Sequence, residues 1–476
     1  MHKDCDLLGE IWLPENVYYG AQTARALQLF EQSVYTIGQF PSFIFCMGAI
    51  KKACAVVNGK LDLLKQEHVN AIAQACDEVM EGKHNDQFVL DMLSGNDFAP
   101  IHMNFNEVIA CRANEILTGA KSFDIITPNS HVNLGTSTCD TAYIAARFAF
   151  YFDCGKVIEA VKQLKLAYED KARQGKHSVK TAHTCFQDAS PVTFGQFYGA
   201  AASFLARQIG LLEGLRGEAV IHTIGDTVIG TGLGSFEGFE ERIGEELENI
   251  LGVKCVHSAN PFDDLQYGDF FLRASALLKS TITGISKMAR DIRVMASGPR
   301  AGFSEITIAP VQNGSSYFPG KVNPSLPELV NIACYQICGC DASITMAVEA
   351  GELDVTPWYP VFTVNLLNEC SLIYRTVPAF AEKCVSTIRI NEESNREKAG
   401  GSLGMATVVS AMLGYKNATK VALHAMEKGC SIAEAVVELG LLPREEAARV
   451  FDPFKLADKE ESRRLLTQLA RRDNRY

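Results

Sequence analysis

The chain has a deficit of basic residues, and this deficit limits the partners that it can have. Across 476 residues there are 45 Lys and Arg against 56 Asp and Glu, a formal net charge of −11. A nucleic-acid surface needs clustered positive charge, so we expect no nucleic-acid partner. No apolar run reaches membrane-spanning length without a charged or turn-forming residue, so we expect no membrane partner. The composition is that of a soluble globular protein.

A disulfide framework and a signal peptide are also missing. The 15 cysteines are odd in number and scattered, and the chain opens with Met-His-Lys-Asp-Cys. We therefore expect free thiols in a reducing cytoplasm. Cys334, Cys338 and Cys340 lie close together in a helical pattern, but no second group of ligands accompanies them. Small buried helix residues are the better explanation, so we expect no metal ion.

Strand patterns are scarce, and helical patterns fill most of the chain. Strands are predicted only at 219–223 and 228–230. Long helices are predicted at 141–168, 194–215, 268–295, 326–350 and 361–380, and shorter ones at 20–26, 59–80, 106–117, 403–413, 417–428 and 431–439. Long helices that are apolar on more than one face need partners. The predicted fold class is therefore mainly α, with a central long-helix bundle and helix packing between subunits.

One loop, residues 314–324, combines mobility with groups that bind a carboxylate. Its sequence is Gly-Ser-Ser-Tyr-Phe-Pro-Gly-Lys-Val-Asn-Pro. The glycines permit backbone conformations that other residues avoid. Lys321 supplies a cation and Asn323 an amide donor, a pair suited to holding a carboxylate. Ser315 and Ser316 place two small hydroxyls beside them.

The loop resembles the signature of the aspartase/fumarase superfamily, G-S-S-x-M-P-x-K-x-N-P, with Phe318 in place of methionine. Other segments resemble the same family in the same order. They are 17–23, 102–113, 131–140, 184–189 and 297–302. Together they cover most of the chain and are most similar to the aspartase and class II fumarase branch.

The resemblance implies a fold and an assembly. It implies a mixed, mostly helical N-terminal domain at 1–136, a central helical bundle at 137–395 that carries the mobile loop, and a small C-terminal helical domain at 396–476. It also implies a homotetramer whose active sites combine residues from three subunits. The expected partner is a small amino-acid-derived molecule, and the expected location is cytoplasmic.

The resemblance also implies a reaction, the anti β-elimination of nitrogen or oxygen from a carboxylate substrate without a cofactor or metal. Ser315 takes the position of the catalytic base, which its loop must activate because a free serine is a poor base. Thr184, Lys321 and Asn323 take the positions that hold the carboxylate beside the leaving group.

The second carboxylate site departs from the family pattern. Where Gly-Thr-Ser-Ile-Asn is expected, Ala99 replaces the threonine donor and His102 the asparagine. In the segment usually read S-T-N-D, Ser137 and Thr138 remain, but Cys139, a weak donor, replaces asparagine. Cys185 stands where fumarases have histidine. These changes indicate that the second substituent of the substrate is not a carboxylate.

Several interpretations remain open at this point. The departures are most similar to ergothionase, a trimethylamine lyase of this superfamily, and aromatic residues such as Tyr317, Phe318, Phe98 and Tyr143 suit a quaternary ammonium group or, alternatively, a packed core. An aspartate ammonia-lyase that rebuilds the second carboxylate site from Ser137, Thr138, Ser316 and His102 is the alternative. A fumarase and a non-catalytic family member are weaker alternatives.

A glycine-rich stretch at 230–234 lacks the strand and helix of a dinucleotide-binding motif, so we expect no nucleotide cofactor. Asp226, shortly before it, either supplies a charge to the active site or caps a local turn.

Overall fold

The computed structural model describes residues 2–472, and these form two compact units. Unit 1 comprises the residues up to Glu159 together with Ile209–Ile282 and Ala333–Tyr374. Unit 2 comprises Ala160–Gln208, Thr283–Ile332 and the residues from Arg375 onward. The protein is 64% helical, which confirms the prediction of a mainly α fold. The domain boundaries at residues 136 and 395 stay a prediction.

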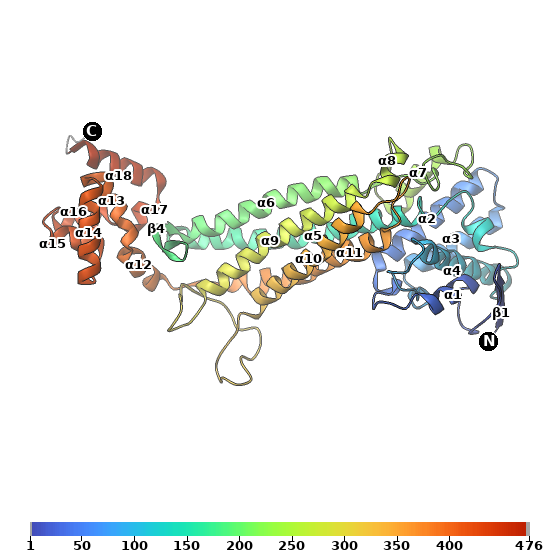
Figure 1. Ribbon diagram of the computed structural model, residues 1–476, viewed down its shortest axis with the longest axis horizontal. Coiled ribbons are helices and arrows are strands. Elements are labelled where there is room, and N and C mark those ends of the chain that lie inside the picture. The colour runs from blue at the N-terminus through green and yellow to red at the C-terminus, as the bar shows by residue number, and fades with distance from the viewer. Residues whose placement is uncertain (1, 473–476) are drawn as a thin grey trace. The chain divides into compact units, whose positions relative to one another are not determined.

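The N-terminal part of unit 1 contains a short hairpin and helices. They are β1 (His2–Asp6), β2 (Gly9–Leu13), α1 (Ala21–Leu29), α2 (Pro41–Lys60), α3 (Gln66–Met80) and α4 (Ala99–Thr118). Five long helices contribute residues to both units (Figure 1). They are α5 (Ala142–Gln174), α6 (Phe194–Glu218), α9 (Asp269–Met295), α10 (Ser325–Glu349) and α11 (Tyr359–Lys383).

Shorter elements lie between the long helices. They are β3 (Val179–Thr184), β4 (Gln187–Thr193), β5 (Ile221–His222), α7 (Glu240–Leu251), β6 (Val256–His257), α8 (Pro261–Gln266) and β7 (Ile306–Thr307). The chain continues with β8 (Arg389–Ile390), α12 (Glu392–Gly401), α13 (Ala406–Leu413), α14 (Tyr415–Lys428), α15 (Ile432–Glu438), α16 (Arg444–Val450), α17 (Pro453–Ala457) and α18 (Lys459–Arg472). The strands pair two by two, β5 with β6 in parallel and the others antiparallel.

The long helices match their predicted ranges closely, but two local predictions were wrong. The single helix predicted at 59–80 is instead the end of α2 followed by α3. The chain turns after Lys60, where Asp62 adopts a left-handed conformation with φ of 58°. The strand predicted at 228–230 is a turn that ends at Gly230, whose φ is 100°. The hairpin of β3 and β4 was not predicted.

An aromatic cluster fills the core of unit 1 around α2 and α4. The Phe43 ring lies 5.6 Å from that of Phe98 and 6.0 Å from that of Phe105. Tyr143 stacks on Tyr359 with ring centroids 3.4 Å apart. All five are buried. Phe98 and Tyr143 are therefore core side chains, as in the packed-core alternative, and do not form aromatic faces for a quaternary ammonium group.

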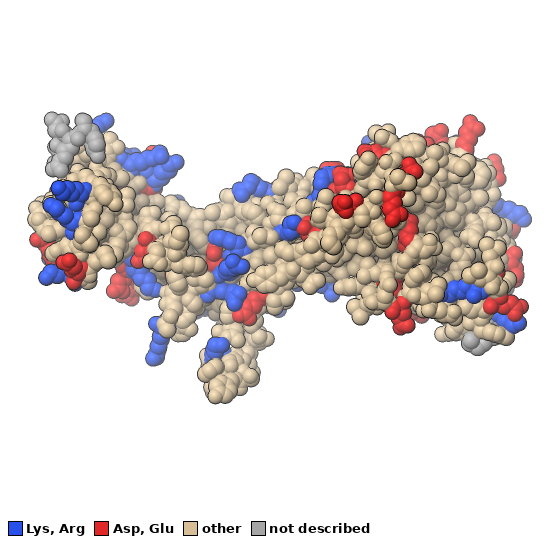
Figure 2. Space-filling model, viewed as in Figure 1, with Lys and Arg blue, Asp and Glu red and all other residues tan. Residues whose placement is uncertain are grey.

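Among the described residues, α2 alone is long and apolar enough to cross a membrane, and 72% of its apolar window is buried inside the protein. A helix of this kind is typical of a protein core. On the face drawn in Figure 2, Lys and Arg side chains lie among Asp and Glu side chains.

Candidate active site

The glycine-rich loop of unit 2 is closed at its neck by one backbone contact. The Ser315 amide donates to the Lys321 carbonyl oxygen over 2.8 Å. A Cβ atom at Gly314 would lie 1.6 Å from that oxygen, so this position accepts no side chain. The two strands of the loop can approach only because residue 314 is glycine.

Ser315 Oγ receives two backbone hydrogen bonds inside this loop. The amide of Tyr317 donates to it over 3.1 Å and the amide of Phe318 over 3.0 Å. Donors that converge on an oxygen favour its charged form, so the loop stabilises an alkoxide at Ser315. These amides are the groups that a serine base needs, and the sequence pattern predicted them only in general terms.

The other loop residues of the predicted site are exposed. Ser316, Lys321 and Asn323 lie on the surface, as do Tyr317 and Phe318, whose rings meet edge to face at 4.9 Å. Lys321 forms the neck with Ser315, and Asn323 follows two residues later. The loop therefore carries a hydroxyl, a cation and an amide within one exposed segment of unit 2.

Thr184 ends β3, at the tip of a hairpin in unit 2. It pairs with Gln187, and the two residues between them, Cys185 and Phe186, have φ values of 52° and 59°. Left-handed conformations at two consecutive residues define a type I′ turn, which normally uses Asn and Gly. Cys and Phe are strained here by about 1 kcal/mol each or more. Strain of this kind often marks a functional segment.

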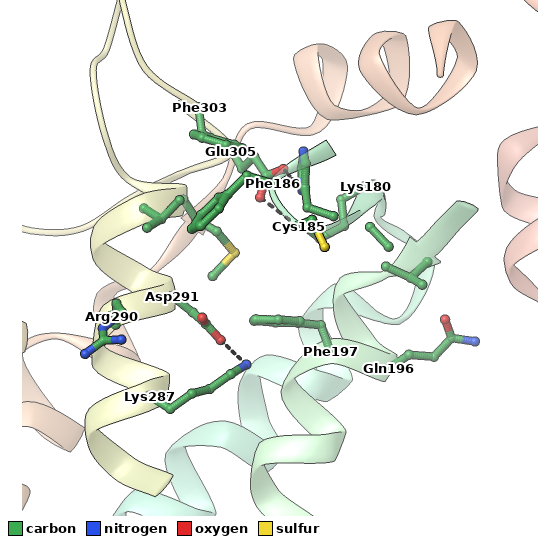
Figure 3. A pocket seen from close by; sticks show the side chains of 15 residues that line it. Lys180, Cys185, Phe186, Gln196, Phe197, Lys287, Arg290, Asp291, Phe303 and Glu305 are labelled. Atoms are coloured by element: carbon green, nitrogen blue, oxygen red, sulfur yellow. Dashed lines mark hydrogen bonds and ion pairs between the residues drawn. The ribbon is translucent and has the colours of Figure 1, made fainter. Parts of the chain in front are cut away.

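A cavity of about 540 Å³ lies beside this hairpin, between β3, α6 and α9 (Figure 3). Lys180 and Glu305 line it, both buried, with Nζ and Oε2 2.9 Å apart. Lys287 and Asp291 of α9 form a second ion pair at the opposite side. Each pair joins one positive and one negative side chain, so most of the charged groups that line this cavity are paired within unit 2.

Unit 1 brings together the other predicted residues, Ala99, His102, Ser137, Thr138 and Cys139. His102 lies on α4 with 2% of its surface exposed. Burial, together with the charge of Lys51, holds the pKa of this imidazole well below its usual range, so the ring is neutral. It carries one hydrogen and one free lone pair.

The hydrogen-bond chain around His102 fixes which nitrogen carries that hydrogen. The Thr141 hydroxyl donates to the Ser137 carbonyl over 2.5 Å and so accepts from His102 Nε2, 3.2 Å away. Nδ1 is then the acceptor, and the Thr138 hydroxyl donates to it over 3.0 Å. The hydroxyl hydrogen of Thr138 is therefore used inside the protein.

The Ser137 hydroxyl is used in the same way. It donates to Asp140 Oδ1 over 3.0 Å. The amides of Gly225 and Thr227 each donate to Asp140 Oδ2 over 3.1 Å. Burial raises the pKa of Asp140 to about 6 in spite of these donors, so the group is mostly a carboxylate at neutral pH. Sequence analysis missed Asp140, although it follows Cys139 directly.

The remaining two positions offer little hydrogen bonding. Ala99, at the first turn of α4, has no side-chain donor. Burial raises the pKa of the Cys139 thiol to about 12, so it stays a protonated, weak donor. In the cluster formed by Ala99, His102, Ser137, Thr138 and Cys139, called here the α4 cluster, the Ser137 and Thr138 hydroxyl hydrogens are both engaged within the protein.

Asp226 lies near the α4 cluster and is paired. Its Oδ2 lies 2.9 Å from Nε2 of His257, whose pKa is raised chiefly by this hydrogen bond. Glu240 Oε1 lies 3.4 Å from the other ring nitrogen. Asp226 therefore holds a local imidazole rather than capping a turn.

Comparisons with known proteins agree over most of the chain. A family described as "Lyase" matches residues 9–339, and one described as "Fumarase C C-terminus" matches 405–458. An aspartate ammonia-lyase from Bacillus sp is 36% identical over 95% of this chain and 96% of its own, and one from Escherichia coli strain K12 is 33% identical over 94% of each.

Solved structures are similar over the same span. A fumarate lyase:delta crystallin from Brucella melitensis bound to cobalt has a TM-score of 0.92, 35% identity, and coverage of 96% of this chain and 99% of its own. A class II fumarase from Schistosoma mansoni has a TM-score of 0.93 at 29% identity, with the same coverage.

Proposed function

Since the chain belongs to the aspartase/fumarase superfamily and is a carbon–nitrogen lyase, we propose that it eliminates trimethylamine from ergothioneine. The product is thiourocanate. The observation that carries this proposal is the hydrogen-bonding state of the α4 cluster, in which the Ser137 and Thr138 hydroxyl hydrogens are both used within the protein. A second carboxylate would find no free hydroxyl donor on either residue.

Ser315 acts as the base in this proposal. Its oxygen removes a proton from the carbon that carries the thioimidazole, and the electrons of that C–H bond form the C=C bond. The C–N bond breaks with its electrons on nitrogen, and trimethylamine leaves neutral. The amides of Tyr317 and Phe318 lower the free energy of the Ser315 alkoxide that starts this step.

The carboxylate beside the leaving group is assigned to Thr184, Lys321 and Asn323. Lys321 supplies the charge and the other two supply hydrogen bonds. A quaternary ammonium group departs without a proton, so no acid is needed at Cys185, the exposed turn residue next to Thr184. Tyr317 and Phe318 place two exposed aromatic rings on the loop, and aromatic faces attract quaternary ammonium groups.

The thioimidazole ring is assigned to the α4 cluster. It must acidify its neighbouring C–H bond as the second carboxylate does in aspartate. Ala99 has a smaller side chain than the threonine expected at its position, which favours a bulkier substituent. The Thr138 hydroxyl can offer the substrate only its oxygen lone pair, because its hydrogen is bound to His102. A lone pair matches an N–H of the substrate and not a carboxylate oxygen.

Aspartate ammonia-lyase is the second candidate, and the comparisons favour it over ergothionase. Both curated relatives described above have that name. In this alternative, Ser137, Thr138, Ser316 and His102 would rebuild the second carboxylate site. Thr138 would then have to release His102 and leave a buried ring nitrogen without its donor, at about 1–3 kcal/mol.

We also propose that the chain assembles into a homotetramer whose active sites are built from three subunits. A second proposal is that the protein is located in the cytoplasm. The tetramer proposal has a direct test by subunit mixing. Inactive Ser315→Ala and inactive His102→Ala proteins, unfolded and refolded together, should regain about a quarter of the native sites if the residues come from different subunits. Ser315→Ala mixed with Lys321→Ala should regain none, because both residues lie on one loop.

The proposed reaction is tested by ultraviolet spectra of the purified enzyme with ergothioneine and, in parallel, with aspartate. Ergothioneine should give a new long-wavelength band and released trimethylamine, and Ser315→Ala should lose both. Fumarate absorbance from aspartate with ergothioneine unchanged would replace the proposal by the second candidate. A Ser315→Ala protein of unchanged activity on either substrate would exclude Ser315 as the base.

A further inference from the structure

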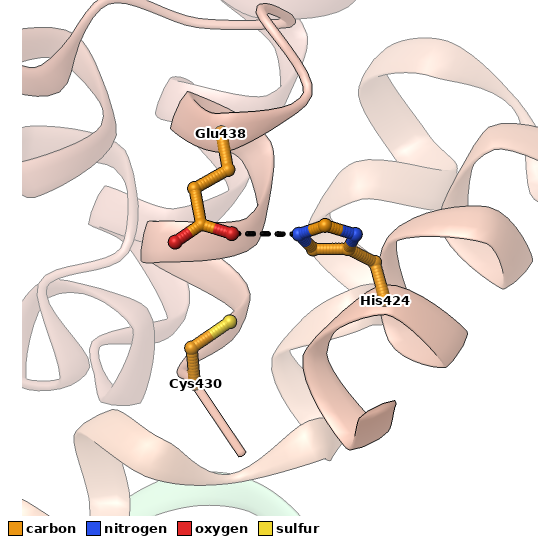
Figure 4. Close-up of side chains that lie close together, drawn as sticks. All are labelled: His424, Cys430 and Glu438. Atoms are coloured by element: carbon orange, nitrogen blue, oxygen red, sulfur yellow. Dashed lines mark hydrogen bonds and ion pairs between the residues drawn. The ribbon is translucent and has the colours of Figure 1, made fainter. Parts of the chain in front are cut away.

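A group of three potential metal ligands lies in the C-terminal helices of unit 2 (Figure 4). His424 belongs to α14, Cys430 follows that helix, and Glu438 is the last residue of α15. We propose that these side chains form a binding site for a divalent transition metal ion, with Zn²⁺ as the preferred ion. The site is separate from the residues assigned to the elimination.

The ligand atoms are already close to a coordination geometry. His424 Nε2 and Glu438 Oε2 are 2.7 Å apart, and the Cys430 sulfur and these two atoms all lie within 4.8 Å of one another. Ligand atoms around tetrahedral Zn²⁺ are roughly 3.4 Å apart, given bond lengths of about 2.0–2.3 Å. Small side-chain rotations would therefore bring all three to one ion.

The local fold holds the three residues in place. Gly429, at φ of 64°, ends α14 in a left-handed turn, and the Cys430 amide donates to the Ala425 carbonyl over 3.1 Å. Ser431 and Glu434 form a capping box that starts α15 immediately afterwards. The backbone around Cys430 is thus fixed from both sides.

The packing beneath the site adds to this rigidity. Val421 and Ala425 of α14 are buried against Ile432, Ala435 and Val436 of α15 in one hydrophobic core. The spacing of the helices that carry His424 and Glu438 is therefore set by the core and does not depend on a metal. A ligand set held in advance loses less conformational entropy on binding.

The chemistry of the three groups favours zinc over harder cations. A thiolate and an imidazole select zinc and similar metals, whereas magnesium and calcium prefer oxygen ligands only. Glu438 completes a three-ligand set and leaves a fourth position open to water or an anion, since its side chain is 52% exposed.

The charges around the three ligands also favour a cation. The carboxylates of Glu438 and Glu434 both act on Cys430, and their negative charge attracts a metal ion to this group. The spacing of these ligands, six and eight residues apart, matches no common zinc motif, which is why the sequence alone gave no signal.

The test uses the full-length protein after treatment with a chelator. Zn²⁺ is titrated against a chromophoric competitor, and Co²⁺ is added separately as a spectroscopic probe of sulfur ligation. We expect one site per chain whose cobalt spectrum contains a thiolate charge-transfer band. Cys430→Ser should remove that band, and Cys430→Ser, His424→Ala and Glu438→Gln should each weaken zinc binding by roughly tenfold or more.

Two controls separate this site from other thiols and acids. Cys5→Ser removes an exposed thiol elsewhere and should leave the site intact. Asp226→Asn alters the other described group of possible ligands, formed with Glu240 and His257, and should also leave it intact. Equal zinc affinity in wild type and Cys430→Ser, or loss of binding with Asp226→Asn alone, would overturn the proposal.

Discussion

Nδ1 of His102 accepts a hydrogen bond from the Thr138 hydroxyl, 3.0 Å away. The direction of this bond follows from Thr141, which donates to the Ser137 carbonyl and so must accept from the other ring nitrogen. The hydrogen of the Thr138 hydroxyl is thus bound to His102, and only the oxygen lone pairs can still accept a hydrogen bond. The proposed preference for ergothioneine over aspartate depends on this arrangement.

The first prediction concerns this bond. Thr138→Val removes the donor and leaves a buried ring nitrogen unpaired, so the free energy of unfolding should fall by about 1–3 kcal/mol. Turnover of ergothioneine should fall by roughly threefold to tenfold, because valine also removes the oxygen lone pair that is proposed to accept from a substrate N–H. Urea unfolding and steady-state kinetics measure the two effects. Thr138→Ser keeps the hydroxyl and should match wild type in both.

The second prediction concerns the reverse change. His102→Asn restores the family residue and frees the Thr138 hydroxyl, so kcat/KM for aspartate should rise by roughly tenfold or more while that for ergothioneine falls. The two values are measured on one preparation. A parallel fall in both would mean that His102 serves folding alone.

The third prediction concerns the base. Ser315→Ala should lower kcat by roughly a thousandfold, the size expected when a general base is removed. KM should change little, because the carboxylate is assigned to other residues. Ser316→Ala, one position along the same exposed loop, should lose less. Activity of Ser315→Ala within tenfold of wild type would rule this role out.

The fourth prediction concerns the neck of the loop. Gly314→Ala places a Cβ where the Lys321 carbonyl oxygen lies, so the loop cannot adopt its observed conformation. A displacement of about 1 Å in a catalytic group can lower turnover a hundredfold, and we expect a loss of that size in kcat. Stability should hardly change, because the loop is exposed. Gly214→Ala, at an exposed and unobstructed position of α6, is the matched control and should keep full activity.

The fifth prediction concerns pH. Burial raises the pKa of Asp97 from its ordinary value of 3.8 to about 6. Between these values the folded protein binds this proton more tightly than the unfolded chain does, so the contribution of Asp97 to the free energy of unfolding falls as pH rises from about 4 to about 6. Asp97→Asn keeps an acceptor for the Tyr143 hydroxyl, 2.5 Å from Asp97. Between about pH 4 and about pH 6, the free energy of unfolding of the variant should rise by about 2 kcal/mol relative to that of wild type. Above this interval the difference between the two proteins should stay constant. Unfolding curves at several pH values test the sign.

Local sequence patterns predicted the long helices well because the helical hydrophobic pattern repeats over many residues in each of them. The helix predicted at 194–215 is α6, and that predicted at 268–295 is α9, each within a few residues. The hairpin of β3 and β4 escaped prediction because its turn is Cys185-Phe186, which lacks the usual turn residues.

The membership of the site stays a prediction from the sequence, and the hydrogen bonding among its residues could not be predicted at all. The signature loop singled out Ser315, Lys321 and Asn323 from sequence alone. The donation from Thr138 to His102 depends on Thr141 and on how α4 packs beside the start of α5, and no local pattern contains that information. Tertiary contacts decide which hydrogen a hydroxyl can offer to a substrate.

The most direct test of the substrate assignment is the ratio of kcat/KM for ergothioneine to kcat/KM for aspartate, measured on one preparation of the wild-type enzyme. A protein whose Ser137 and Thr138 hydroxyl hydrogens are used internally should favour ergothioneine by roughly 10⁴ or more, the discrimination expected when a hydrogen-bonding site meets the wrong group. A ratio below one would contradict the account and would assign the chain to aspartate.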